Sequence, residues 1–139
     1  MEAGLVTSDP IFLAALQLLA QHEHNPEKFV IYCDYWLRCR INRLPGTTVP
    51  VKVLDTAVWH EFGPVRAIKT LQASLGDLGK PVRIDGQIGE ETVTACRDAD
   101  PQSLLIMYRA RLKERLIEMI AEKPELAEFH DAWIARANA

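Results

Sequence analysis

The chain has 139 residues, of which 48% are hydrophobic and 25% charged, the composition of an ordinary soluble globular domain. Its formal net charge of −3 argues against a nucleic-acid-binding protein, because such proteins usually carry a clear excess of lysine and arginine. The three cysteines form no Cys-x-x-Cys pair, so we expect reduced thiols packed as small apolar side chains.

The N-terminal residues lack the basic segment that begins a secretory signal peptide. The apolar run at residues 11–20 is too short to span a bilayer. We therefore expect a protein that is made in the cytoplasm without a signal peptide and is not inserted in a membrane.

Helix-start signals recur along the first half of the chain. An Asp-Pro pair at residues 9–10 and an Asn-Pro pair at residues 25–26 each place a capping side chain before a proline. They predict helices over residues 11–21 and 26–41. Apolar residues at helical spacing in the second of these predict one buried stripe, formed by Phe29, Cys33 and Trp36.

The remaining elements also read as helices. Their predicted ranges are 51–61, 65–75, 90–98, 101–123 and 126–137, on the evidence of periodicity and of glycine and proline boundaries. Gly76 is predicted to end the helix that begins at Val65. Because no segment reads as a strand, the predicted fold class is all-α with about six to seven helices.

A glycine-rich loop precedes the helix at residues 90–98, and it contains the sequence IDGQIG. Gly86 and Gly89 permit positive φ, so a tight turn is predicted there. Ile84 and Ile88 are predicted to fill the core on either side of this turn, and Gly89 or a nearby polar side chain is predicted to cap the helix that follows.

Three segments of the second half resemble a known module. They are this loop, the long Leu/Arg-rich helix after the Asp-Pro pair at residues 100–101, and the segment at residues 129–133. The module is the C-terminal peptidoglycan-binding module of the family 108 glycoside hydrolases, which are lysozyme-like N-acetylmuramidases of bacteria and phages, some labelled secretion activators. The resemblance extends upstream through residues 31–36 and 54–72. It implies a lysozyme-like helical fold in a single domain, with a shortened muramidase-like half at residues 1–76 and a peptidoglycan-binding-type module at residues 77–139.

The catalytic acid of that family ends an N-terminal helix, in a His-Glu-Gly-Gly type motif. Residues 16–23 resemble the end of that helix and place Glu23 at the position of the acid. His24 and Asn25 replace the two glycines, and the long loop that lines the sugar cleft in the family has no counterpart. A glycosidase acid needs a partly dry pocket that keeps it protonated, and the sugar must be gripped. We therefore expect a catalytically degenerate relative that acts by binding peptidoglycan or a protein partner.

Two alternatives stay open at this point. The chain could be an active N-acetylmuramidase, with Glu23 as general acid and with Asp55 or Glu61 assisting. It could instead have turned its helical scaffold to binding a protein partner, in a phage particle or as an inhibitor.

The resemblance also implies where peptidoglycan would bind. The candidate residues lie in the glycine-rich turn, with one tryptophan that we expect to be partly exposed: Asp85, Gly86, Gln87, Gly89 and Trp59. No metal site and no cofactor are expected, because the cluster of His22, Glu23 and His24 lacks a third ligand to complete a metal site.

Overall fold

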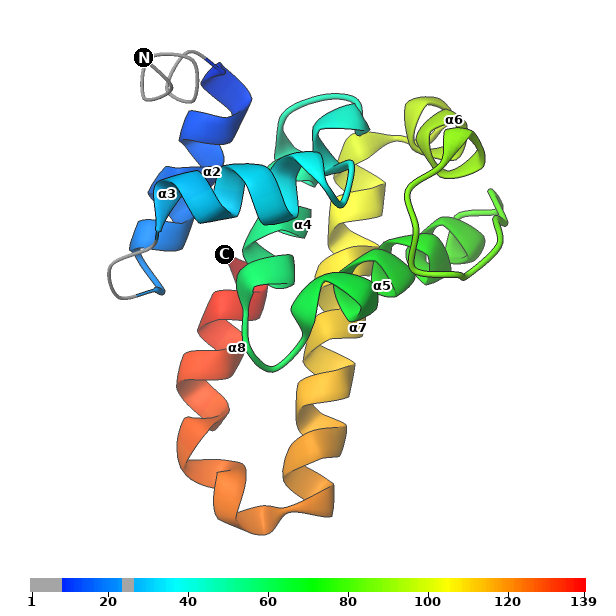
Figure 1. Ribbon diagram of the computed structural model, residues 1–139. Coiled ribbons are helices and arrows are strands. Elements are labelled where there is room, and N and C mark those ends of the chain that lie inside the picture. The colour runs from blue at the N-terminus through cyan, green and yellow to red at the C-terminus, as the bar shows by residue number, and fades with distance from the viewer. Residues whose placement is uncertain (1–8, 24–26) are drawn as a thin grey trace.

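The computed structural model describes residues 9–23 and 27–139, and Figure 1 shows the arrangement of their helices. The α-helices are α2 (Pro10–Ala20), α3 (Lys28–Val30), α4 (Thr48–Val58), α5 (Gly63–Asp77), α6 (Glu90–Asp98), α7 (Pro101–Glu122) and α8 (His130–Asn138). A π-helix (Ile31–Leu37) and 3-10 helices at Ile41–Arg43 and Pro124–Phe129 complete the helical elements. No described residue lies in a strand, so the all-α prediction is confirmed.

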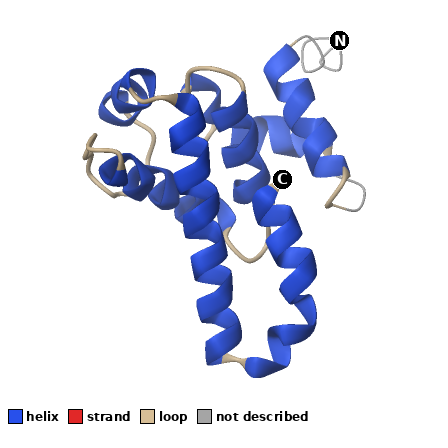
Figure 2. Ribbon diagram, turned by 180° about the vertical axis from the view of Figure 1, so that it is seen from behind, coloured by secondary structure: helices blue, strands red, loops and turns tan. Residues whose placement is uncertain are grey.

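Helices α4, α5 and α7 form the centre of the molecule. Helix α4 packs against α2, α5 and α7, and α5 packs against α7. Helices α7 and α8 form an antiparallel hairpin whose connection projects away from the other helices, and α8 returns the chain toward α4 (Figures 1 and 2). None of the described helices is both long enough and apolar enough to cross a membrane.

One hydrophobic cluster joins the two parts of the chain. Its largest fully buried apolar members come from α2, α4, α5 and α7 and from the 3-10 helix at Ile41–Arg43: Phe12, Leu19, Ile41, Leu54, Leu71, Leu75, Leu104, Tyr108, Leu112 and Leu116. The predicted division of the chain at residue 76 stays a prediction. Helix α5 crosses this boundary and contributes buried residues to the cluster along its length.

Local capping signals predict two helix starts correctly. The Asp9 side chain accepts hydrogen bonds from the backbone N–H groups of Ile11 and Phe12, at 3.0 and 3.2 Å, and so starts α2. The second Asp-Pro pair acts in the same way, because Asp100 accepts a hydrogen bond from the N–H of Ser103 at the start of α7. The predicted start at Asn25-Pro26 lies outside the described residues, as does His24.

Helix α5 continues beyond Gly76, so the predicted stop is wrong. The helix ends in a Schellman motif around Gly79, which has φ of 78°. The N–H of Lys80 donates to the carbonyl of Leu75 at 2.9 Å, and that of Gly79 donates to the carbonyl of Gly76 at 3.1 Å. Of these two glycines only Gly79 adopts the left-handed backbone conformation that ends the helix, whereas Gly76 is an ordinary residue of the helix interior.

The predicted stripe of the second helix is also wrong in part. Phe29 is 56% exposed, and the buried residues are Ile31, Trp36 and Ile41, spaced five apart. The chain forms a π-helix here, with the N–H of Arg38 bonded to the carbonyl of Cys33 five residues earlier. The wider turn changes which side chains share a face, and periodicity of an ordinary α-helix cannot anticipate it.

Candidate functional site

All the candidate site residues except Asp55 lie around two different cavities. One cavity has a volume of about 410 Å³ and is lined by the glycine-rich turn; we call it the turn cavity. The other has a volume of about 270 Å³ and is lined by Glu23 and Glu61; we call it the acid cavity. The predicted binding residues are therefore divided, because Trp59 lines the acid cavity while Asp85, Gly86, Gln87 and Gly89 line the turn cavity.

The turn at residues 85–89 is held by Gln72, a side chain of α5 that is 1% exposed. Its Oε1 accepts hydrogen bonds from the backbone N–H groups of Asp85 and Gly86, both at 3.0 Å. The two hydrogens of its Nε2 are shared among three acceptors: Oδ1 of Asp85 at 3.0 Å, the carbonyl of Gln87 at 2.9 Å and Oγ1 of Thr92 at 3.1 Å. One buried amide therefore fixes both the turn and the start of α6.

Gly86 is required by two features of this turn. Its φ of 77° lies in the left-handed region, and an added Cβ would lie 2.9 Å from Cγ1 of Val65. Ile88 is buried as predicted, at 3% exposed. Ile84 is 54% exposed, so its predicted core position is wrong: the extended segment before the turn directs this side chain outward, beside α5 and α7.

Polar groups face the turn cavity from both of its sides. Asp85 and Gln87 are exposed, and Arg38 and Arg40 face them from the segment after the π-helix. The hydrogen bond from Gln72, with a second from the N–H of Gln87, holds the pKa of Asp85 below its usual value. The cavity thus offers a carboxylate, an amide and two guanidinium groups, which can bind the hydroxyl and acetamido groups of a sugar.

Arg40 adopts a strained backbone conformation at the edge of this cavity. Its φ of 62° makes it the one non-glycine residue with positive φ among those that the structure describes. Such a conformation costs about 1–3 kcal/mol, and residues of this kind are concentrated at binding and active sites.

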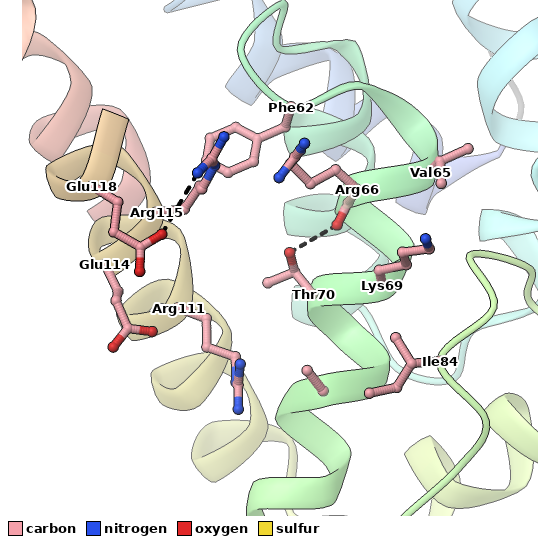
Figure 3. Close-up of a pocket in the computed structure, with 11 residues that line it drawn as sticks. Phe62, Val65, Arg66, Lys69, Thr70, Ile84, Arg111, Glu114, Arg115 and Glu118 are labelled. Carbon is pink, nitrogen blue, oxygen red and sulfur yellow. Dashed lines mark hydrogen bonds and ion pairs between the residues drawn. The ribbon is translucent and has the colours of Figure 1, made fainter. Parts of the chain in front are cut away.

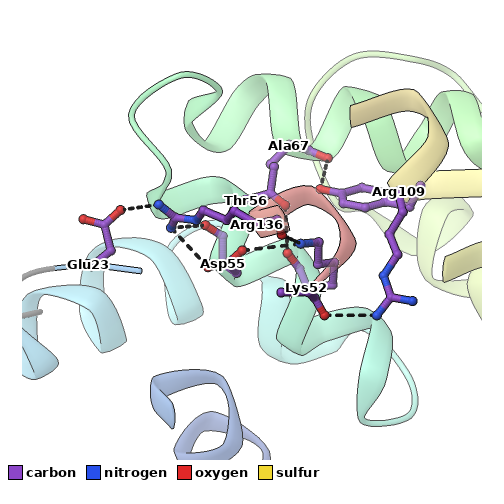
Figure 4. Close-up of polar contacts among 9 residues, drawn as sticks. Glu23, Lys52, Asp55, Thr56, Ala67, Arg109 and Arg136 are labelled. Carbon is purple, nitrogen blue, oxygen red and sulfur yellow. Dashed lines mark hydrogen bonds and ion pairs between the residues drawn. The ribbon is translucent and has the colours of Figure 1, made fainter. Parts of the chain in front are cut away.

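Beside the acid cavity lies a network of four charged residues, which we call the buried ion network: Glu23, Lys52, Asp55 and Arg136 (Figure 4). Nη1 of Arg136 donates to Oε2 of Glu23 at 2.9 Å, and its Nη2 donates to Oδ1 of Asp55 at 3.1 Å. Nζ of Lys52 lies 3.5 Å from Oδ2 of Asp55 and donates to the carbonyl of Arg136 at 2.7 Å. Helix α8 is thereby tied to α4 and to the end of α2.

Burial decides what these groups can do. Asp55 is completely buried and lines neither cavity, so its carboxylate balances two cations inside the protein. Burial lowers the pKa of Lys52 to about 8, against the opposing effect of Asp55. Burial also lowers the pKa of His22, which lines the acid cavity. The expected partial exposure of Trp59 is wrong, because Trp59 is 3% exposed and its ring lies under the guanidinium of Arg136 at 4.7 Å.

The acid cavity does bring two of the proposed catalytic residues together. Glu23 and Glu61 both line it, with His22, His60, Trp59 and Trp133. Oε2 of Glu23 nevertheless points at Arg136, where it accepts a charge-assisted hydrogen bond. Within residues 9–23 and 27–139, no three His, Cys, Asp or Glu side chains are grouped so that they could hold a metal ion.

Sequence reasoning missed the roles of Gln72, Lys52 and Arg136. Gln72 reads as a polar residue on a helix, and only its place in the Leu-Gln pair that resembles the hydrolase family singled it out. Arg136 contacts Asp55 and Glu23 across 81 and 113 positions of the chain, and no local pattern reports such pairings.

A family model supplies an independent finding. PG_binding_3, described as a predicted peptidoglycan domain, matches residues 66–138, which is more than half of the chain. The matched segment contains Gln72, the turn at residues 85–89 and Arg136. The chain has no match among curated proteins or solved structures.

Proposed function

The chain belongs to the predicted peptidoglycan-domain family, and from this premise we propose that it is a peptidoglycan-binding protein without muramidase activity. The family match supports interaction with peptidoglycan. The lack of catalysis, the binding face and the origin as a shortened relative of the family 108 glycoside hydrolases are the finer parts of the proposal.

The contact between Glu23 and Arg136 is the observation that carries the proposal. A general acid must hold a proton when the glycosidic bond breaks. Glu23 instead directs its Oε2 at the guanidinium group of Arg136 and accepts a 2.9 Å hydrogen bond there, so this oxygen is engaged by the protein and not by a sugar. Arg136 is itself fixed by Asp55 and has only 8% of its side chain exposed, so it cannot swing away without breaking a buried contact.

The turn cavity is the binding face that we propose. Six of its eleven lining residues lie in the matched segment, and two of them, Asp85 and Gln87, present exposed polar side chains. The turn is rigid because Gln72 holds it through buried hydrogen bonds. A rigid site loses less conformational entropy when it binds a sugar. The strained backbone of Arg40 supports the same location.

Purified Gram-negative sacculi test both parts of the proposal. The turbidity of a sacculus suspension is followed with the wild type and with Glu23→Gln in parallel, beside a known muramidase, and the sacculi are then pelleted. We expect no clearing by either protein and both proteins in the pellet. A Gln87→Ala variant is expected in the supernatant, because it loses a polar group of the turn cavity but no buried contact.

An active muramidase is the second candidate, and the specific observation in its favour is that Glu23 and Glu61 share the acid cavity with two histidines. The same assay separates the candidates. Clearing by the wild type but not by Glu23→Gln would establish the enzyme. Wild-type protein that neither clears nor pellets would support the alternative in which the scaffold binds a protein partner.

A further inference from the structure

A third cavity lies between α5 and α7, and none of the residues that the sequence predicted to bind peptidoglycan lines it. Its volume is about 590 Å³, within the usual range for ligand sites. Figure 3 shows Arg66 and Thr70 projecting from α5, and Arg111 and Arg115 projecting from α7, toward the space between the two helices. We call this cavity the α5–α7 groove.

The groove is locally positive although the whole chain carries a net charge of −3. Its charged lining consists of the cations Arg66, Lys69, Arg111 and Arg115 and the carboxylates Glu114 and Glu118. Four cations against two carboxylates attract anionic groups to this face.

Two of the four cations have no carboxylate of their own. Arg111 is held by Asp77 through hydrogen bonds of 2.6 and 2.9 Å, and Arg115 lies 3.6 Å from Glu118. Arg66 and Lys69 are exposed, and neither forms an ion pair with any residue that the structure describes. These two side chains are therefore available for an anionic ligand.

Apolar side chains complete the groove. Val65 and Ile84 line it with side chains that are 57% and 54% exposed, and Phe62 lines it as well. A ligand that suits this lining carries carboxylates together with small apolar groups. Short peptides that contain alanine and terminate in carboxylates have this chemistry.

The groove is continuous with the turn cavity. Val65 lines both cavities, and Ile84 in the groove directly precedes Asp85 in the turn. In peptidoglycan, peptide stems that carry free carboxylates branch from the glycan chain. One segment of the polymer could therefore place its sugars at the turn and a stem in the groove.

We propose that the α5–α7 groove binds the carboxylate-bearing peptide stem of peptidoglycan, with Arg66 and Lys69 as its specificity-determining residues. The inference rests on the proposed function and names the part of the polymer that the protein reads. The carboxylates of Glu114 and Glu118 face the same groove, so it disfavours a polyphosphate such as a nucleic acid and suits a peptide that also carries an amine.

Competition on sacculi tests the inference. Wild-type protein bound to purified sacculi is challenged with a free stem tetrapeptide, and separately with the same tetrapeptide after its carboxylates are amidated. The double variant Arg66→Gln/Lys69→Gln is compared with Lys28→Gln/Arg97→Gln, which removes the same charge from exposed positions outside the groove.

We expect the free tetrapeptide to release the protein and the amidated one to be about tenfold weaker, because charge-assisted hydrogen bonds are lost. The groove variant should bind sacculi about tenfold more weakly and the control variant should bind like the wild type. If the wild type pellets but both peptides compete equally, or if the groove variant binds normally, the stem inference is overturned while the proposed function stands. Wild-type protein that never pellets would overturn both.

Discussion

Asp55 is fully buried between Lys52 and Arg136, so at the scale of single residues its carboxylate has the largest expected effect on stability. Asp55→Asn keeps the shape of the side chain but leaves the buried Lys52 without a counter-ion and Arg136 with only the partly exposed Glu23. We expect the free energy of unfolding to fall by about 3–5 kcal/mol, measured by urea denaturation.

Glu23→Gln is the matched control for this change, because Glu23 pairs with the same arginine but has 30% of its side chain exposed. Its expected cost is about 1 kcal/mol or less, since solvent screens a partly exposed pair. Equal losses for the two variants would show that Asp55 does not have the buried structural role assigned to it.

Lys52 gives the stability a pH dependence of known sign. Its pKa is about 8 in the folded protein and 10.5 is its ordinary value, so between these values the unfolded chain binds more protons than the folded one. The contribution of Lys52 to the free energy of unfolding must therefore rise as the pH rises from about 8 toward 10.5.

The effect is measured as the difference in unfolding free energy between the wild type and Lys52→Met, at several pH values under reducing conditions. This difference should increase by about 2 kcal/mol in favour of the wild type across the window. A difference that stays constant would mean that Lys52 keeps its ordinary pKa in the folded protein.

Gly86 and Gly76 are glycines with opposite expected responses to alanine. Gly86→Ala is strained, with φ of 77° and a new Cβ 2.9 Å from Val65, and should lose about 1–3 kcal/mol of unfolding free energy. Gly76 lies inside α5, and a Cβ there meets no atom within 4 Å, so Gly76→Ala should gain about 0.5–1 kcal/mol. Thermal denaturation of both variants checks the signs, and a neutral Gly86→Ala would contradict the described turn.

At the scale of elements, the turn at residues 85–89 depends on a side chain from α5. Gln72→Leu would leave two backbone N–H groups and a carbonyl without their partner, at an expected cost of about 2–4 kcal/mol. The variant should also bind sacculi less well, because the turn would lose its fixed shape.

Gln102→Leu, at an exposed position of α7, is the control and should change stability by about 0.5 kcal/mol or less. Urea denaturation and sacculus pelleting are measured on both variants. Normal pelleting by a folded Gln72→Leu protein would contradict the proposed role of the turn.

Elements that are specified by neighbouring residues could be predicted from the sequence. The side chains of Asp9 and Asp100 accept backbone hydrogen bonds at the predicted starts of α2 and α7, and α6 has its predicted bounds. The predicted end of α5 is two residues too early because both Gly76 and Gly79 are plausible stops, and backbone conformation alone separates them. The π-helix was missed because its hydrogen bonds change the spacing of buried residues.

The candidate site could be predicted only where the signal was local. The turn residues 85–89 do line one cavity, and Glu23 and Glu61 do line another. The pairing of Glu23 with Arg136 depends on how α8 returns to α4, and the cations of α5 and α7 meet only after these helices pack. Such information is distributed over the whole fold.

At the scale of the whole molecule, the structure has two faces that could meet the cell wall. The turn cavity and the adjoining α5–α7 groove form one, and the acid cavity beside the buried ion network forms the other. We assign binding to the first face and a structural role to the residues that border the second.

The most direct test of this assignment is a titration of ¹⁵N-labelled protein with soluble peptidoglycan fragments, followed by the backbone amide shifts. We predict that shifts concentrate at residues 84–89 and on the facing sides of α5 and α7, and that the amides of Glu23 and Glu61 stay unchanged. Shifts confined to the acid cavity would contradict this assignment and favour the second candidate function, an active muramidase.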